Sequence, residues 1–141
     1  MNTWRTPEVE GRAPCARNSH TAQAVEIRGQ TGRIIIFGGS CPERGPMNDT
    51  YELLVRGWHS HLRVDALTDA NPGTDSCHLT WNKIDCIGDM PSPRELHAAC
   101  ILDDSSIVVS GGRHTSQVFD DCYKLYLSTS VYQFLLRFLF A

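Results

Sequence analysis

The sequence lacks the features that mark several common classes of protein. Its formal net charge is −3 at pH 7, so it has no excess of positive charge of the kind that binds nucleic acid or anionic membranes. No apolar run reaches the roughly 20 residues that a membrane-spanning helix needs. A Gly-x-Ser-x-Gly elbow and a phosphate-binding glycine loop followed by Lys are both absent. We therefore expect neither nucleic acid nor membrane as a partner, and nothing indicates catalysis.

The six cysteines include no C-x-x-C pair, the spacing typical of zinc knuckles and thioredoxin-type sites. The first residues also lack the charged start and apolar stretch of a secretory signal, so we expect a cytoplasmic or nuclear protein with free thiols. His59, His61, Cys77 and His78 carry side chains that suit zinc, but their spacing fits no fixed motif. We expect no cofactor and no bound metal.

What the chain has instead is an internal repeat. Five residues recur at one constant offset of 77 positions (81 − 4 = 77). The pairs are Trp4 and Trp81, Gly11 and Gly88, Pro14 and Pro91, Arg17 and Arg94, and His20 and His97. Each copy continues with a Gly pair and then with a Tyr in an apolar segment, and these residues are Gly38, Gly39 and Tyr51 in the first copy and Gly111, Gly112 and Tyr123 in the second. A constant offset over so many residue types predicts two copies of one structural unit.

Short alternating segments bounded by Gly, Pro, Asn or Asp predict β-strands. They are residues 20–27, 33–37, 50–55 and 79–84 in the first copy and 97–102, 106–110 and 122–127 in the second. No segment before the C-terminal tail has sustained helical periodicity, so we predict an all-β body. Each copy should form a four-stranded antiparallel meander, although the fourth strand of the second copy is missing or divergent in the sequence.

Two segments interrupt this pattern. Residues 54–78 separate the third and fourth strands of the first copy, where a short hairpin would suffice. A long loop inside a compact unit is usually functional or disordered, and we expect disorder here. Residues 128–141 form an apolar tail with one charge, which we interpret either as a divergent strand or as an end created by truncation of a longer reading frame. A membrane anchor through this tail is the less favoured alternative, because the tail is too short to span a bilayer.

The ordered combination of Trp, Gly, Pro, Arg, His, Gly-Gly and Tyr resembles the kelch repeat, whose unit of about 50 residues is one four-stranded β-propeller blade. Without the insertion of about 25 residues at 54–78, the period of 77 comes close to that value. The resemblance implies a partial kelch-type propeller of two four-stranded antiparallel blades with incomplete ends. It assigns residues 1–19 to the outer strand of a preceding blade and a crossing, 20–84 to the first blade, 85–127 to the second blade and 128–141 to the tail.

Repetition indicates that the shared residues are structural. A catalytic residue is needed once, whereas a residue that builds the fold is needed in every blade, so we interpret His20 and His97 as structural rather than as catalytic bases. Arg17 and Arg94 suit the fastening of a crossing because a planar guanidinium can hold several backbone carbonyls at once. The Trp and Tyr residues would supply the large apolar faces that stack one blade on the next.

The resemblance further implies a binding module whose contacts come from loops at one end of the propeller. Carried over by position, the ligand-side residues are Asn18, Ser19, Ser40, Glu95, Leu96, Arg113 and His114. Arg113 stands out because an Arg at a pocket rim can grip a carboxylate in bidentate fashion.

We predict a protein-interaction module without catalysis, a kelch scaffold or an adaptor fragment that recognises a protein or peptide for a larger complex. Further blades or self-association would be needed to close the propeller. The alternatives are a fragment of a kelch-propeller enzyme of oxidase or specifier type and a non-functional truncated product.

Overall fold

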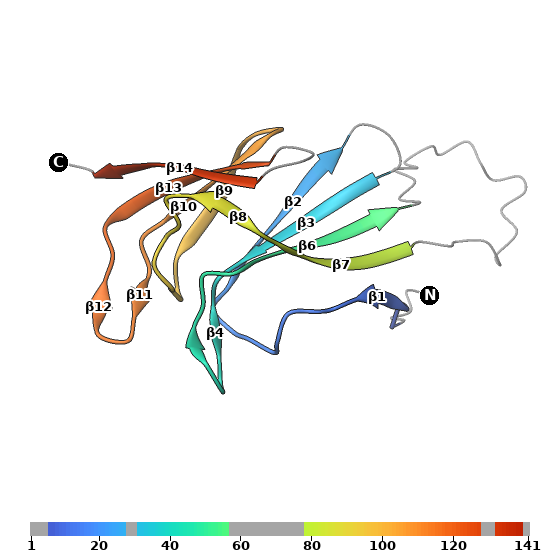
Figure 1. Cartoon of the computed structure of the whole chain (residues 1–141), viewed down its shortest axis with the longest axis horizontal. Helices are drawn as coiled ribbons and strands as arrows, with labels where there is room; N and C mark the ends of the chain where they lie inside the picture. Colours follow the sequence, from blue (N-terminus) through green and yellow to red (C-terminus); the bar gives the residue numbers. More distant parts are fainter. Residues whose placement is uncertain (1–5, 28–30, 57–77, 128–131, 140–141) are drawn as a thin grey trace, which may run out of the picture.

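The structure is a computed structural model that describes residues 6–27, 31–56, 78–127 and 132–139. Within these residues all regular structure is β, arranged as two five-stranded sheets and two short hairpins (Figure 1). The prediction of an all-β chain is confirmed. No helix able to cross a membrane occurs in the part of the chain that the structure describes.

The first sheet contains the first blade. Its strands are β2 (Thr21–Ile27), β3 (Thr31–Phe37), β6 (Thr50–Arg56) and β7 (His78–Ile84). Each pairs antiparallel with the next, which makes the expected meander. A short strand, β1 (Val9–Gly11), runs parallel to β7 on its outer edge. The crossing that leads into the blade therefore passes along the blade's outer edge, while Trp4 lies outside the described residues.

The predicted insertion at 54–78 begins later and ends earlier than expected. Leu54 and Val55 continue the ladder of β6 by pairing with Thr80 and Leu79, and Arg56 pairs with His78. Val55 is β-branched and only 5% exposed, which suits a strand better than a loop. Residues 57–77 lie outside the described residues, and so does the prediction that they are disordered.

The second sheet has the same topology as the first. Its strands are β9 (Ala98–Asp103), β10 (Ser106–Ser110), β13 (Asp121–Leu127) and β14 (Tyr132–Leu139), with β8 (Cys86–Gly88) parallel to β14 at the outer edge. A short hairpin follows the second strand of each blade, β4 (Ser40–Cys41) with β5 (Gly45–Pro46) and β11 (Arg113–His114) with β12 (Gln117–Val118). The two sheets lie next to each other, and β2 contacts β9 (Figure 1).

The apolar tail supplies the fourth strand of the second blade, and Phe134 stands where the first blade has Trp81. Phe134 pairs with Leu125 as Trp81 pairs with Leu53. A Cβ on Gly88 would overlap the carbonyl oxygen of Phe134, just as one on Gly11 would overlap that of Trp81. Of the two interpretations of the tail, the divergent strand is therefore right, and the strand lacks a Trp because the position requires only a large apolar ring.

A core of alternating side chains holds the two blades together. It consists of Val25, Ile35 and Phe37 from the first blade and Ile107, Val109, Tyr123, Leu125, Leu127 and Phe134 from the second. The rings of Phe37 and Phe134 meet across the interface with centroids 5.5 Å apart. Since side chains alternate between the two faces of a strand, Ile34 and Ile36 point away from this core.

The first blade's other face has no neighbour among the described residues. Val109, Leu125 and Phe134 are at most 1% exposed in the second blade, whereas their counterparts Ile36, Leu53 and Trp81 are only half-buried. At these three positions the equivalent surfaces differ in burial, because another blade covers only one of them, whereas Tyr51 and Val55 on the same face are still only 8% and 5% exposed.

A buried polar cluster also joins the blades. The hydroxyl of Tyr132 donates to Glu52 Oε1 at 2.8 Å and accepts from Arg33 Nη1 at 3.0 Å, while Arg33 and Glu52 form an ion pair at 3.5 Å. Burial, followed by the Glu52 carboxylate, raises the pKa of Tyr132 to about 12. Ser106 occupies the position of Arg33 in the second blade (106 − 33 = 73), so this cluster is specific to one blade interface.

Candidate binding face

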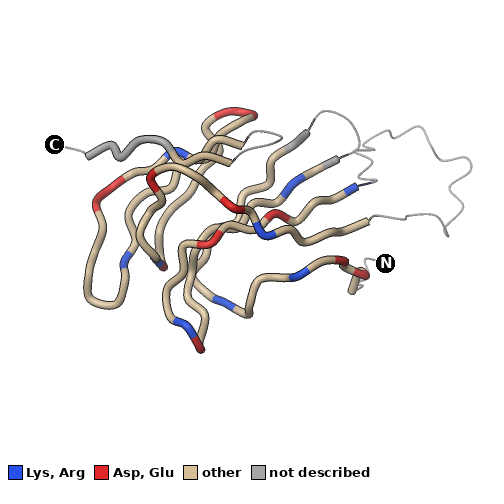
Figure 2. The backbone as a smooth tube through the Cα atoms, viewed as in Figure 1, with Lys and Arg blue, Asp and Glu red and all other residues tan. Residues whose placement is uncertain are grey.

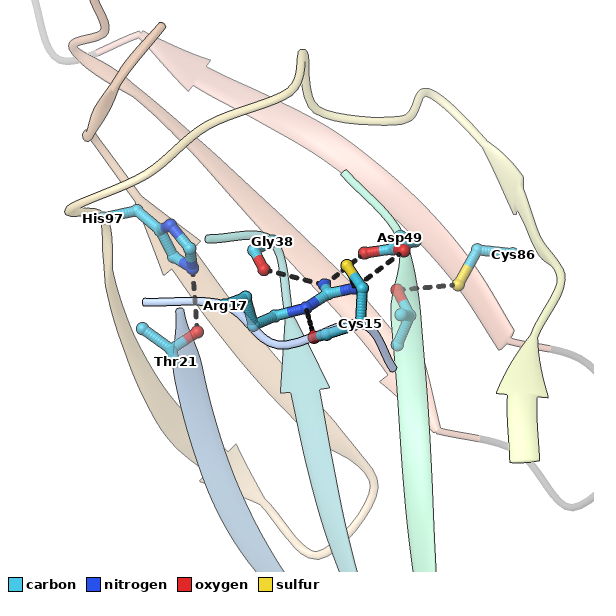
Figure 3. Close-up of polar contacts among 8 residues, drawn as sticks. Cys15, Arg17, Thr21, Gly38, Asp49, Cys86 and His97 are labelled. Carbon is cyan, nitrogen blue, oxygen red and sulfur yellow. Dashed lines mark hydrogen bonds and ion pairs between the residues drawn. The ribbon is translucent and has the colours of Figure 1, made fainter. Parts of the chain in front are cut away.

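Arg17 fastens the crossing to the first blade (Figure 3). Its Nε donates to the Cys15 carbonyl at 3.3 Å, and its Nη1 donates to the Gly38 carbonyl at 3.0 Å. Both carboxylate oxygens of Asp49 accept from the same guanidinium, at 2.5 and 3.2 Å. Burial alone would lower the pKa of Arg17, but the hydrogen bond and charge of Asp49 outweigh burial and leave that pKa raised.

Arg94 repeats this geometry in the second blade. It donates to the Ser92 carbonyl at 3.1 Å, to the Gly111 carbonyl at 2.8 Å and to both oxygens of Asp121 at 2.5 and 3.0 Å. The residue is fully buried, and its guanidinium lies 4.3 Å from the centroid of the Phe119 ring.

Sequence analysis did not find the two aspartates as partners of the arginines. The signal was present, because Asp49 and Asp121 keep the offset of the following tyrosines (121 − 49 = 72). Their distance along the chain from Arg17 and Arg94 hides the contact, since only the folded blade brings them together.

The two repeated histidines have different environments. His97 is 7% exposed, its Nε2 lies 2.8 Å from Thr21 Oγ1, and its ring packs edge-on against Phe37 at 5.3 Å. Burial, followed by the charge of Arg94, lowers the pKa of His97 to about 4. His20 is exposed. His97 is therefore neutral at physiological pH and serves as a contact between blades.

The low pKa of His97 makes stability depend on pH. A folded-state pKa of about 4 lies below the ordinary 6.5, so protonation favours the unfolded chain. The stabilisation is complete above pH 6.5 and is lost as the pH falls toward 4, a total of about 3 kcal/mol. The free energy of unfolding, measured by urea titration at a series of pH values, should fall less steeply between pH 6.5 and pH 4 in His97→Gln than in the wild type. The exposed His20→Gln should keep the wild-type slope, and equal slopes in all three proteins would contradict the buried neutral state of His97.

All seven predicted ligand-side residues meet at one end of the sheets, where both short hairpins project (Figure 1). Backbone hydrogen bonds pair Asn18 with Ser40 at 3.0 and 2.8 Å and Glu95 with Arg113 at 2.9 Å in both directions. The amide of Leu96 donates to the Ser19 carbonyl at 3.1 Å and so joins the two pairs. We call this surface, residues 18–19, 40, 95–96 and 113–118, the Gly-pair end.

Glycine is required where the Gly pairs meet these residues. A Cβ on Gly39 would lie 2.6 Å from the Asn18 carbonyl oxygen, and one on Gly112 would lie 2.7 Å from that of Glu95. Both glycines also have positive φ, 85° and 92°, a conformation that costs other residues roughly 1–2 kcal/mol. The Gly pairs thus let the crossing approach the hairpin closely enough for backbone pairing.

Arg113 is already engaged within the protein. Its Nε donates to Glu95 Oε1 at 3.1 Å, and its side chain is 51% exposed. The expected bidentate grip on a ligand carboxylate would therefore involve the terminal Nη atoms, which make no hydrogen bond with the described residues. His114, half-buried, pairs with Gln117 across the β11–β12 hairpin.

The Gly-pair end also exposes two large apolar side chains. Leu96 is 60% exposed and Val118 is 78% exposed. They lie on neighbouring backbone segments, since Val118 pairs with Arg113, which in turn bridges to Glu95. The tip of this hairpin is uncharged, whereas the β4–β5 hairpin carries Glu43 and Arg44 (Figure 2). Sequence analysis missed Val118, although it lies where the second copy departs from the first in both length and residue type.

No group of three or more His, Cys, Asp and Glu side chains that could hold a metal converges in the described ranges. Of the four residues weighed above as zinc ligands, only His78 falls in those ranges, as the exposed first residue of β7.

Comparisons with known proteins agree with this architecture. The family model described as the KLHDC2/KLHL20/DRC7 Kelch-repeats domain matches residues 1–132. Acyl-CoA-binding domain-containing protein 4 of Arabidopsis thaliana is 30% identical over 127 residues, 90% of this chain and 15% of its own length. The human Rab9 effector protein with kelch motifs is 33% identical over 121 residues, 84% of this chain and 26% of its own length. The chain thus spans about a quarter or less of the length of these relatives, and it belongs to the kelch-repeat family.

Proposed function

We propose that this chain is a protein-interaction module that binds a protein or peptide partner through the Gly-pair end and has no catalytic role of its own. Kelch-repeat domains are commonly interaction modules, and one similar protein is named as an effector of Rab9. The observation that carries the proposal is the exposure of Leu96 and Val118 on a surface held by backbone hydrogen bonds. Single exposed apolar residues are ordinary, so the proposal depends on both lying at the same end of the molecule, on backbone segments that pair through Arg113.

The chemistry of this end suits a protein partner. Protein interfaces combine an apolar centre with a polar rim in which Arg is enriched. Leu96 and Val118 would provide the centre, and the ion pair of Arg113 with Glu95 would lie at the rim. At the tip of the β11–β12 hairpin, Thr115, Ser116 and Gln117 are exposed and uncharged. A partner that covers this tip would therefore remove no charged group from water there.

The proposed role is that of a scaffold or adaptor part in the cytoplasm or nucleus, completed by further blades or by self-association. The enzyme alternative, a fragment of a kelch oxidase or specifier, makes a different prediction. Metal and redox-cofactor analysis of the purified protein should find neither in stoichiometric amount, and stoichiometric copper or iron would contradict the interaction proposal.

The binding proposal can be tested with peptides selected from a random display library on the full chain. We expect the joint substitution Leu96→Ala and Val118→Ala to weaken binding of the selected peptides at least about tenfold, because hot-spot side chains contribute more than 1 kcal/mol each. Leu102→Ala is the matched control, since Leu102 is 58% exposed against 60% for Leu96 but lies in β9 outside the Gly-pair end. Fluorescence anisotropy with labelled peptides measures both affinities. Equal losses in both proteins, or a loss in Leu102→Ala alone, would contradict the proposed surface.

A further inference from the structure

Two cysteines come together beside Arg17 in the first blade. Cys15 lies in the crossing before β2, and Cys41 is the last residue of β4. The reciprocal backbone hydrogen bonds between Asn18 and Ser40 hold these two segments against each other in antiparallel orientation. The Cys15 side chain is the largest single influence on the Cys41 thiol and lowers its pKa, which places the two side chains next to each other. Both cysteines are free thiols.

Polar groups surround both sulfur atoms. Arg17 Nη2 donates to Cys15 Sγ at 3.3 Å (Figure 3). The neighbouring Cys15 side chain and, after it, the backbone at Glu43 and Arg44 lower the pKa of Cys41, although burial opposes this shift. Because the thiolate is the reactive form of cysteine, this arrangement favours Cys41 as the attacking sulfur once its neighbour Cys15 has been oxidised.

The thiol pair is not part of the repeated architecture. The second copy has Ser92 in place of Cys15 (92 − 15 = 77) and His114 in place of Cys41 (114 − 41 = 73). Arg94 nevertheless makes the same backbone and carboxylate contacts as Arg17. A blade is thus fastened equally well without sulfur at these positions, so the two cysteines are available for a separate role.

We propose that Cys15 and Cys41 form a reversible disulfide by exchange with a low-molecular-weight disulfide such as oxidised glutathione. Cys15 is only half-buried, whereas Cys41 is 3% exposed, so the first attack falls to Cys15. Its thiolate displaces one glutathione thiolate and forms a mixed disulfide. The Cys41 thiolate then attacks the Cys15 sulfur and displaces the second glutathione thiolate. In total, two protein thiols are oxidised to one disulfide, and one glutathione disulfide is reduced to two glutathione thiols. The two protons released by the protein thiols are taken up by the two glutathione thiolates.

This disulfide would act on one half of the Gly-pair end. It would tie the crossing covalently to the β4–β5 hairpin, next to Asn18, Ser19 and Ser40. The half formed by the second blade would keep its own hydrogen bonds. Oxidation therefore stiffens the first-blade side of the surface, whether or not that surface binds protein.

Peptide mapping by mass spectrometry tests the proposal. The full chain is equilibrated with defined ratios of reduced and oxidised glutathione, alkylated and digested with trypsin, which cleaves between the two cysteines at Arg17, Arg28 and Arg33. We expect the Cys15–Cys41 cross-linked peptide as the main intramolecular product. In Cys41→Ser that peptide should be lost and Cys15 should stop at the glutathione mixed disulfide.

Cys100→Ser is the matched control, because Cys100 is exposed and lies in β9. This variant should form the cross-link as the wild type does. The proposal is overturned if Cys15 and Cys41 stay separately alkylated under conditions that oxidise Cys100, or if Cys41→Ser leaves the product at Cys15 unchanged.

Discussion

Replacing Arg94 by Met should lower the free energy of unfolding by about 3–5 kcal/mol, because removal of one partner leaves a buried charge without compensation. The charge in question is the carboxylate of Asp121, which is 7% exposed and accepts two hydrogen bonds from Arg94. The carbonyl oxygens of Ser92 and Gly111 lose a donor at the same time. Urea unfolding followed by circular dichroism gives the free energies.

A second variant keeps this prediction testable if Arg94→Met does not fold. Arg94→Met combined with Asp121→Leu removes both charges, and replacing a buried ion pair by apolar side chains is often close to neutral. The double variant should therefore recover at least half of the lost stability. A loss of less than about 1 kcal/mol in Arg94→Met, or no recovery in the double variant, would contradict the role given to Arg94.

Truncation of Phe134 to Ala should cost about 3–5 kcal/mol, the usual range for a fully buried aromatic side chain. Phe134 is 0% exposed and packs against Phe37 across the blade interface. Its loss would leave a cavity between the blades and weaken the hold of β14, which pairs with β13 on one side and β8 on the other.

Trp81→Ala is the matched control for Phe134→Ala, since the two residues occupy equivalent positions in their blades. Trp81 is only half-buried and meets Tyr51 edge-on at 6.5 Å, so we expect a cost of about 1–2 kcal/mol. Calorimetric unfolding compares the two proteins. A larger cost at Trp81 than at Phe134 would show that the first blade's other face is buried in solution, contrary to the structure described here.

The repeat in the sequence was enough to predict the fold, because every blade needs the same residue types at the places where its backbone segments approach closely. Each Gly pair follows the second strand of its blade, where a Cβ would overlap the crossing. The strands that carry alternating apolar residues were found within a few residues of their bounds. Positions with such local requirements leave a mark on the sequence in every copy.

Contacts between residues far apart along the chain were harder to predict from the sequence. The repeat marks Asp121 as the counterpart of Asp49, but only the pairing of β10 with β13 shows that Asp121 reaches Arg94. The same limit explains why Phe134 was not recognised as the counterpart of Trp81.

The burial of each repeated residue depends on whether another blade covers it. His20 and His97 hold the same position in the repeat, yet His97 is enclosed between the blades whereas His20 is exposed. Sequence could assign both to the fold, but it could not tell them apart, because burial depends on which face another blade covers.

The candidate binding surface was only partly predictable. Position in the repeat located its seven residues, and the structure places them at one end. The position of a residue in the repeat could not show that Arg113 Nε already donates a hydrogen bond to Glu95. It also could not show that Val118 has the largest exposed fraction among the large apolar residues that are exposed in the described ranges.

Amide hydrogen exchange of the full chain with and without a selected peptide tests the central claim, that the Gly-pair end binds a protein partner, most directly. Bound peptide should slow exchange in segments 95–96 and 113–118 and leave the hairpin at 103–106, at the other end of β9 and β10, unchanged. Protection confined to 103–106 or to the uncovered face of the first blade, with none at 113–118, would contradict it.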